Sequence, residues 1–238
     1  MNLIIDIGNT NIKFALFRGQ TLLVNGSGNS ADFDLFLKGK KIVNTIISSV
    51  SRSEEVEAVL IDKGLNFIHL SSETKVPVSN NYTTPTTLGD DRLANVIGAS
   101  VLFPNTNVLT IDCGTCIKFD AITVQKEYKG GAISPGLQMR FKALNHFTNG
   151  LPFIEPQKID FFIGDSSKNS ILSGVINGCI QEIEGVITQY NAIYENLTVI
   201  LTGGDASFFD KELKSNIFVE SKLTLIGLNE ILLYNSRS

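Results

Sequence analysis

The sequence predicts an α/β protein built from two related domains with a cleft between them. Its 238 residues suit one large domain or two of ordinary size. Apolar β patterns alternate with helical patterns along the whole chain. A strand that ends in Asp6 before a glycine turn has a counterpart that ends in Asp112, and an internal repeat of this kind indicates duplication. We therefore expect one domain over residues 1–107 and the other over residues 108–238.

The first half predicts a three-stranded meander followed by alternating helices and strands. Gly26 and Gly28 fit a loose dinucleotide-binding pattern, but no acidic residue follows at the end of the next strand, so we expect a flexible turn over residues 26–31. The expected strands are 3–6, 11–17, 21–24, 41–50 and 67–70, the expected helices are 32–37, 54–63 and 92–103, and 76–87 is a loop rich in proline and threonine.

The second half repeats this plan. Strands are expected at residues 108–112, 117–124, 128–132 and 198–201, and helices at 137–145, 166–194 and 223–233. Apolar residues recur at helical spacing in the long helix 166–194, and we expect that this face could bury against a partner chain. These residues are Ile171, Val175, Ile176, Ile180, Ile183 and Ile187.

Composition favours small-molecule chemistry in a reducing compartment. The chain is 43% hydrophobic and 18% charged, with a net charge of −4, which argues against disorder and against a basic nucleic-acid binder. Three cysteines are too few for a disulfide scaffold, so we expect a cytoplasmic protein. No apolar stretch approaches the roughly 20 residues of a membrane span, and no signal peptide opens the chain, so we expect no membrane association.

The two repeated turns have the chemistry of a phosphate site. Each combines a strand-ending aspartate with glycine N–H groups and a threonine hydroxyl. N–H groups and hydroxyls bind phosphate oxygens, whereas a carboxylate must act through a cation. One such turn alone could be an ordinary hairpin. Two turns, followed by Gly203 and Gly204 at a further strand end, favour a polyphosphate ligand.

The motifs together resemble the type III pantothenate kinases, members of the superfamily of acetate and sugar kinases, heat-shock chaperones and actin. The resemblance covers nearly the whole chain and depends on the order and spacing of five motifs. These are Asp6-Ile7-Gly8-Asn9-Thr10-x-x-Lys13, Gly89-Asp90-Asp91-Arg92, Asp112-Cys113-Gly114-Thr115, Gly130-Gly131-Ala132-Ile133-Ser134-Pro135-Gly136, and Thr202-Gly203-Gly204-Asp205-Ala206. The resemblance implies two duplicated ribonuclease H-like (actin-like ATPase) domains, and ATP-dependent phosphorylation of the primary hydroxyl of pantothenate to 4'-phosphopantothenate, the first step of coenzyme A biosynthesis.

The resemblance also assigns the substrate residues. Asp91 is expected to be the catalytic base that accepts the hydroxyl proton. Arg92 is expected to bind the carboxylate of pantothenate, a task that suits a planar donor fork. The alternative for Asp90 and Asp91 is capping of the helix that follows, and we expect Asp90 to cap or to stay solvated. Substrate binding is assigned to Tyr82, Gly89, Asp90, Asp91, Arg92 and Ser167.

The nucleotide and its cations are assigned in the same way. Asp6 is expected to hold Mg²⁺ through water, and Asp112 to bind a monovalent cation, K⁺ or NH₄⁺. Without a side chain, Gly203 and Gly204 let the backbone approach the adenosine closely. ATP and phosphate binding is assigned to Asp6, Gly8, Asn9, Thr10, Lys13, Gly114, Thr115, Gly203, Gly204 and Asp205.

Ser167 is the main departure from the family pattern, which has a threonine at this position before the long helix. In the family this hydroxyl reaches the substrate from the neighbouring subunit, so the resemblance implies a homodimer with a shared substrate pocket. The alternative is that Ser166 or Ser167 only caps the helix.

Other functions remain as alternatives. Another small-molecule kinase or a phosphatase of the same superfamily would have the same fold. A non-catalytic, nucleotide-gated regulatory protein would bind ATP but would not need Asp91, Arg92 and Tyr82. A redox role for Cys113 and Cys116 is disfavoured, because such pairs open a helix whereas the residues that follow predict a strand. His69 and His146 are isolated in the sequence, which favours ordinary packing over metal binding.

Overall fold

A computed structural model describes residues 1–8, 11–49 and 53–236 of the chain. The candidate site residues Asn9 and Thr10 therefore lie outside the described residues. The chain forms two compact units. The first comprises Met1–Asn105, Ile122–Lys129 and Lys222–Ser238, and the second comprises Thr106–Ala121 and Gly130–Ser221. The expected division after residue 107 stays a prediction about where the duplicated halves meet.

The first unit is organised around a five-stranded sheet with the order β3-β2-β1-β4-β5. The predicted meander is confirmed, since β1 pairs antiparallel with β2 and β2 with β3. β4 and β5 continue the sheet parallel to β1, so the carboxyl ends of these three strands meet at one edge. The strands are β1 (Asn2–Ile7), β2 (Ile12–Arg18), β3 (Thr21–Gly28), β4 (Asn44–Ser49) and β5 (Ile68–His69).

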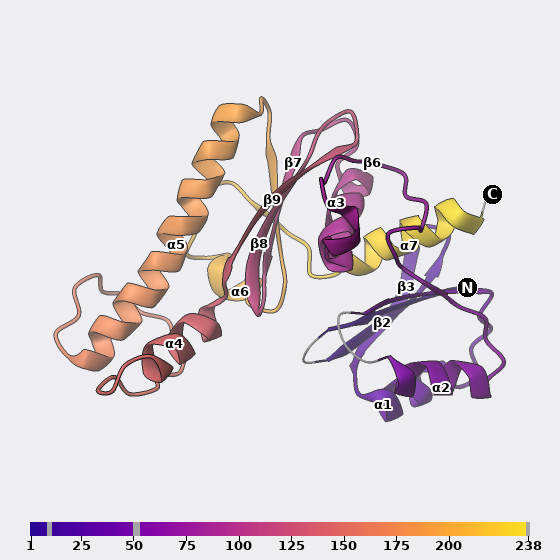
Figure 1. The fold of residues 1–238 in the computed structure, drawn as a ribbon, viewed down its shortest axis with the longest axis horizontal. Coiled ribbons are helices and arrows are strands. Elements are labelled where there is room, and N and C mark those ends of the chain that lie inside the picture. The colour runs from indigo at the N-terminus through magenta and orange to yellow at the C-terminus, as the bar shows by residue number, and fades with distance from the viewer. Residues whose placement is uncertain (9–10, 50–52, 237–238) are drawn as a thin grey trace. The chain divides into compact units, whose positions relative to one another are not determined.

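Helices cover both faces of this sheet (Figure 1). α1 (Ser30–Leu37) and α2 (Glu54–Asp62) pack their apolar residues on one face. On the other face, α7 (Leu223–Ser236) packs against β1 and β4, and α3 (Asp90–Leu102) packs against α7. The predicted helices are present with small shifts of their ends, and α3 begins two residues earlier than the pattern indicated, at Asp90.

The expectation of a flexible turn at residues 26–31 is wrong. β3 continues to Gly28, and Asn29 starts α1 with a capping box in which its side chain accepts hydrogen bonds from the N–H groups of Ala31 and Asp32. The glycine at position 26 has a packing reason instead, because a Cβ there would lie 2.5 Å from the Phe14 ring.

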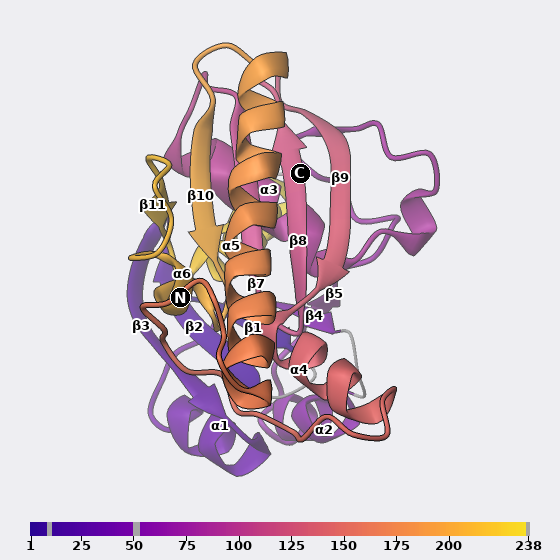
Figure 2. The same cartoon turned by 90° about the vertical axis from the view of Figure 1, so that its left-hand side faces the viewer.

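The second unit contains most of a six-stranded sheet with the order β11-β10-β7-β8-β9-β6. α5 (Ser167–Ile193) runs along one face of this sheet, with α4 (Leu137–His146) near its beginning (Figure 2). None of the described helices is long and apolar enough to span a bilayer. The remaining elements are β6 (Ser79–Asn80), β7 (Val108–Cys113), β8 (Cys116–Ile122), β9 (Glu127–Pro135), β10 (Thr198–Thr202), α6 (Ala206–Phe209), β11 (Phe218–Val219) and a single 3₁₀ turn at Pro85–Thr87.

The apolar face of α5 is used within the chain. Its residues form a core with apolar residues of β7, β8 and β10, and Ile180 packs at the margin of that core. The expectation that this face buries against a partner chain is therefore wrong. Helical periodicity identifies a buried face correctly, but it does not distinguish a sheet of the same chain from a second chain. The fully or nearly buried members are Ile171, Leu172, Val175, Ile176, Cys179, Ile183 and Ile187.

Candidate active site

The first turn of α3 carries Asp91, the predicted catalytic base, and Arg92, the residue predicted to bind the substrate carboxylate. Gly89 is the N-cap residue, and the side-chain Oδ1 of Asp91 accepts a hydrogen bond from the Arg92 backbone N–H at 2.8 Å. The same N–H also donates to the Gly89 carbonyl at 3.1 Å, so the first turn of the helix shares this donor between two acceptors. The Arg92 side chain extends into a buried environment, with only 4% of the residue exposed. A charged guanidinium at this depth is costly unless it has partners, and such residues are typical of binding sites.

Tyr82 is one partner of Arg92. The Arg92 Nη1 donates to the Tyr82 hydroxyl oxygen at 3.3 Å, and the guanidinium carbon lies 5.4 Å from the centre of the Tyr82 ring. The Tyr82 ring is stacked on the Tyr128 ring, with ring centres 6.0 Å apart. The backbone N–H of Tyr82 donates to the Asn80 side chain at 3.0 Å. The structure thus brings Tyr82 and Arg92 together within the first unit, and Asp91 adjoins Arg92 in the chain.

Asp90 does not cap α3, which corrects one expectation. No side-chain hydrogen bond is present at this N-cap, because Gly89 occupies it and Asp90 is already the first helical residue. Asp90 is also partly buried rather than fully solvated. Burial and the neighbouring Asp91 raise its pKa to about 6, and His69 opposes this rise.

His69 was missed as a residue of this region. It ends β5, and its Nε2 lies 3.3 Å from Glu57 Oε1. Because β1, β4 and β5 are parallel, His69 lies at the same sheet edge as Asp6. Its isolation in the sequence gave no signal, since its neighbours come from α2 and from the start of α3.

The described part of the first phosphate motif lies at the end of β1 and the beginning of β2. The Gly8 N–H donates to the Asn11 carbonyl at 3.2 Å. Asp6 is buried with 9% exposure and pairs directly across the sheet with Lys13. Residues that are opposite each other in an antiparallel pair share a face, so this carboxylate and this ammonium are carried on the same side of the sheet.

The second phosphate motif repeats this arrangement in the second unit. The Gly114 N–H donates to the Cys116 carbonyl at 3.1 Å, which closes the turn between β7 and β8. The Asp112 carboxylate lies at the end of β7, and its Oδ2 receives the Lys118 ammonium at 3.1 Å. In both copies the described residues thus place an aspartate near the end of one strand and a lysine in the next strand.

The Gly203-Gly204 segment packs against the second phosphate turn. β10 runs parallel to β7 with Thr202 beside Asp112. The Asp205 N–H donates to the Cys113 carbonyl at 2.8 Å. Gly203 has a φ of +94°, and a Cβ there would lie 2.3 Å from the Cys113 carbonyl oxygen, so only glycine fits.

The Gly204 neighbourhood has room for a ligand. A Cβ on Gly204 would meet no described atom within 4 Å, so a ligand could approach this backbone. Burial raises the pKa of the nearby Asp205 carboxyl. Both glycines thus lie beside the second phosphate turn, and their role in nucleotide binding stays a prediction.

A third loop supports the same turn. The Gly136 N–H donates to the Thr115 carbonyl at 3.1 Å. Arg140 holds the segment before Gly136, because its Nε donates to the Pro135 carbonyl at 2.8 Å and its Nη2 donates to the Ser134 hydroxyl at 3.3 Å.

Arg140 is itself held by α5. Its Nη2 lies 2.5 Å from Glu182 Oε2, so the pair connects the long helix with the segment that packs on the second phosphate turn. Sequence reasoning missed Arg140 and Glu182, although Arg140 lies one helical turn after the quoted glycine motif and this spacing was a possible signal.

Ser166, and not Ser167, caps α5. The Asn169 N–H donates to the Ser166 side chain at 3.3 Å. Ser167 is exposed as the first helical residue, and the preceding segment exposes Phe162 and Ile163 by 74% and 86%. The capping role that was an alternative for both serines therefore belongs to the first of them.

The resemblance implies two cations, Mg²⁺ at Asp6 and a monovalent cation at Asp112. Within residues 1–8, 11–49 and 53–236, no three His, Cys, Asp or Glu side chains gather as a metal site. A single carboxylate such as Asp6 still fits Mg²⁺, which keeps several waters and uses one or two carboxylates together with substrate phosphates. Asp112 fits a dissolved monovalent cation poorly, because Lys118 already places an ammonium 3.1 Å from its Oδ2.

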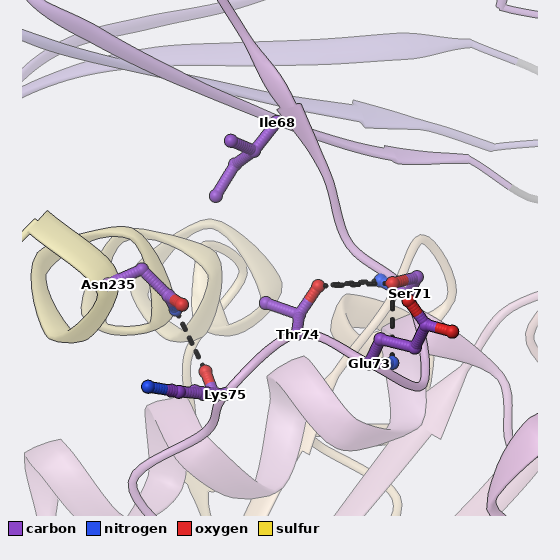
Figure 3. Close-up of a pocket in the computed structure, with 6 residues that line it drawn as sticks. All are labelled: Ile68, Ser71, Glu73, Thr74, Lys75 and Asn235. Carbon is purple, nitrogen blue, oxygen red and sulfur yellow. Dashed lines mark hydrogen bonds between the residues drawn. The ribbon is translucent and has the colours of Figure 1, made fainter.

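A pocket of about 340 Å³ lies elsewhere on the first unit (Figure 3). Its walls are joined by hydrogen bonds, including one from the Asn235 amide to the Lys75 carbonyl at 2.8 Å. None of the predicted site residues lines it, so it does not bear on the chemistry above. The lining residues are Ile68, Ser71, Glu73, Thr74, Lys75 and Asn235.

Comparison with solved structures identifies the fold class. A Campylobacter jejuni protein assigned to the Baf family of transcriptional activators matches with a TM-score of 0.62 and 23% identity, covering 99% of this chain and 100% of the other. A glucokinase from an Antarctic psychrotroph matches with a TM-score of 0.54 and 12% identity, covering 98% of each chain. The protein thus has two ribonuclease H-like domains, the fold of actin-like ATPases and sugar kinases, as the sequence predicted.

Sequence comparison identifies the family within this class. The family model described as type III pantothenate kinase matches residues 2–189. A type III pantothenate kinase of Christiangramia forsetii is 44% identical over 240 residues, which cover 99% of each chain. The chain belongs to the type III pantothenate kinase family.

Proposed function

We propose that this protein transfers the γ-phosphoryl group of ATP to the primary hydroxyl of pantothenate, giving 4'-phosphopantothenate in the first step of coenzyme A biosynthesis. The observation that carries this proposal is the arrangement of Tyr82, Asp91 and Arg92 at the start of α3. It combines a carboxylate that can accept a hydroxyl proton, a buried cation that can bind a carboxylate, and an aromatic ring that orients the cation. A substrate that carries both a hydroxyl and a carboxylate requires these groups.

The substrate residues divide the work as follows. The guanidinium of Arg92 binds the pantothenate carboxylate, and the Tyr82 hydroxyl holds that guanidinium in place. Asp91 accepts the proton of the primary hydroxyl as its oxygen bonds to the γ-phosphorus and the bond to the bridging β–γ oxygen breaks, which releases ADP. Phosphoryl transfer depends mainly on positioning and charge stabilisation, so a correctly placed weak base is sufficient.

The nucleotide is proposed to bind at the phosphate turns and at Gly203-Gly204. N–H groups and hydroxyls of the turns bind phosphate oxygens, with Lys13 as an additional cation. Mg²⁺ bound through water at Asp6 would neutralise phosphate charge. No step is assigned to K⁺ or NH₄⁺ at Asp112, because Lys118 lies on that carboxylate.

We also propose a homodimer with a shared pantothenate pocket. Ser167 is not the capping residue of α5, so its hydroxyl is available for a substrate. Phe162 and Ile163 present exposed apolar side chains in the same segment. The apolar face of α5 is covered by its own sheet, so the contact would use the beginning of the helix and the segment before it. The expected location is the cytoplasm, which agrees with three free thiols.

A panel assay separates this function from its rivals. Purified protein, ATP and Mg²⁺ would be incubated with pantothenate, with sugars and with other small alcohols, and ADP formation would be measured. Phosphorylation of pantothenate alone supports the proposal. Preference for a sugar indicates another kinase of the superfamily, and ATP binding without turnover on any alcohol indicates the regulatory alternative.

A further inference from the structure

We infer that the ammonium group of Lys118 supplies, from within the chain, the positive charge at Asp112 that the family resemblance assigns to a dissolved K⁺ or NH₄⁺ ion. The inference rests on the proposed function, because it concerns the second phosphate turn as part of an ATP site. Its consequence is that nucleotide binding does not depend on a dissolved monovalent cation.

The geometry of the ion pair carries this inference. Lys118 Nζ lies 3.1 Å from Asp112 Oδ2, which is a charge-assisted hydrogen bond and not a distant attraction. The side chains are only 16% exposed at Asp112 and 20% at Lys118, so water screens the pair less than it screens a surface pair. The two residues flank the turn that the Gly114 hydrogen bond closes, so this turn sets their separation.

Gly203 lies beside the other oxygen of the Asp112 carboxylate, since a Cβ at this position would come within 2.5 Å of Oδ1. Asp205 also acts on Cys113, and burial raises the pKa of the Asp205 carboxyl. The Lys118 ammonium contacts the Asp112 carboxylate directly, at 3.1 Å.

The chemistry of the two cations is closely matched. A lysine side chain ends in an alkylammonium, which is a tethered form of the NH₄⁺ ion that the resemblance implies. A tethered group has a high effective concentration at its partner, and so it competes well against a free ion. Lys118 would thereby offset the charge of Asp112, which otherwise repels the phosphates that the turn binds.

Nucleotide affinity in different salts tests this directly. Binding of a non-hydrolysable ATP analogue with Mg²⁺ would be measured by calorimetry in NaCl, KCl and NH₄Cl at equal ionic strength. We expect the wild-type Kd to agree within about twofold among the three salts. In Lys118→Met, which keeps the length and removes the charge, we expect the Kd in NaCl to rise about tenfold, the equivalent of about 1.4 kcal/mol, and to recover in KCl or NH₄Cl.

Two control variants make the result specific. Lys129→Met removes the lysine of an exposed pair with Glu127 and should bind alike in all salts. Lys118→Arg keeps a positive charge, so its Kd for the ATP analogue should stay independent of K⁺. This variant tests the inference even if the methionine variant does not fold.

Several outcomes would overturn the inference. A wild-type protein that binds about tenfold more weakly in NaCl than in KCl would show that the dissolved ion is needed. If Lys118→Met bound the nucleotide in NaCl as tightly as wild type does, Lys118 would contribute nothing to nucleotide binding. A loss that neither K⁺ nor NH₄⁺ restores would assign Lys118 another task. Pantothenate phosphorylation, measured separately, could fail while cation-independent nucleotide binding holds, and that would count against the proposed function only.

Discussion

The Arg92 guanidinium donates a hydrogen bond to the Tyr82 hydroxyl at 3.3 Å and lies over the Tyr82 ring, so a loop residue orients the buried cation of α3. Stacking on Tyr128 holds the tyrosine in turn. Arg92 therefore has a fixed direction before any substrate binds, which reduces the entropy that binding must overcome.

The first prediction concerns this pair. Arg92→Lys keeps the charge and loses the planar fork, so the KM for pantothenate should rise about tenfold or more while the KM for ATP changes little. Tyr82→Phe removes one hydrogen bond, worth about 0.5–1.5 kcal/mol, and should raise the KM for pantothenate by less. Steady-state kinetics with each substrate varied in turn provide the measurement. An equal rise of both KM values would contradict the proposed binding of the pantothenate carboxylate by Arg92.

The second prediction concerns the base. Asp91→Asn keeps the size of the side chain and loses the proton acceptor, so kcat should fall by roughly 10² to 10⁴-fold while ATP still binds. Asp90→Asn, one position earlier, should cost far less and is the matched control. Single-turnover rates and nucleotide binding would be compared in both variants. Similar losses at the two positions would remove Asp91 from the role.

The third prediction concerns pH and Asp90. Its pKa in the folded protein is raised to about 6 from 3.8, so the folded state binds the proton more tightly than the unfolded state. The contribution of Asp90 to stability is therefore present at low pH, declines as pH rises through this window, and becomes a penalty at pH 7.

Asp90→Asn removes that penalty. The variant should melt at a higher temperature than wild type near pH 7, and the difference should shrink toward zero as the pH falls below about 4. Thermal unfolding at a series of pH values measures this. If the difference in melting temperature between the variant and wild type did not change with pH, the pKa of Asp90 would not be raised in the folded protein.

The fourth prediction concerns Arg140 as a positioning residue. Arg140→Met releases the segment before Gly136 from α5, so the KM for ATP should rise about tenfold with a smaller change for pantothenate. Glu182→Gln keeps a hydrogen-bond acceptor and should have a weaker effect. Lys158→Met, which breaks an exposed pair with Glu212, is the control. A lower melting temperature with an unchanged KM for ATP would reduce Arg140 to a structural role.

The fifth prediction separates the two serines at the start of α5. Ser166→Ala removes the cap and should lower stability by about 1 kcal/mol without a specific effect on substrate. Ser167→Ala should weaken pantothenate binding by up to about tenfold with nearly unchanged melting temperature and ATP affinity. Ser167→Thr, the family residue, should be tolerated. Light scattering that finds an active monomer would refute the shared pocket.

The sequence predicted the fold well where local patterns decide it. The repeat correctly placed Asp6 and Asp112 near the ends of two strands, and the predictions of the meander and the long helix are confirmed. The sequence-based prediction was wrong at Gly26. The local pattern indicated a turn, but this glycine lies in a strand and leaves room for the Phe14 ring. The prediction also failed for the partner of the α5 face, because periodicity carries no information about which surface covers it.

The candidate site was predicted only as far as its motifs reach. Tyr82, Asp91 and Arg92 are near one another in the sequence as well as in the structure. His69, Arg140 and Glu182 act from other elements, and their contacts form only when the chain is folded. Lys118 and Asp112 are only six residues apart, yet a lysine that follows a phosphate turn could equally have been a phosphate contact.

The identity of the product decides whether the protein is a pantothenate kinase. Purified protein with ATP, Mg²⁺ and pantothenate would be followed by ³¹P nuclear magnetic resonance and mass spectrometry, with Asp91→Asn in parallel. We expect a phosphate monoester on the primary hydroxyl of pantothenate, formed in equal amount to ADP, and almost none from the variant. ADP formed without this ester, or an equal yield from Asp91→Asn, would refute the proposed reaction.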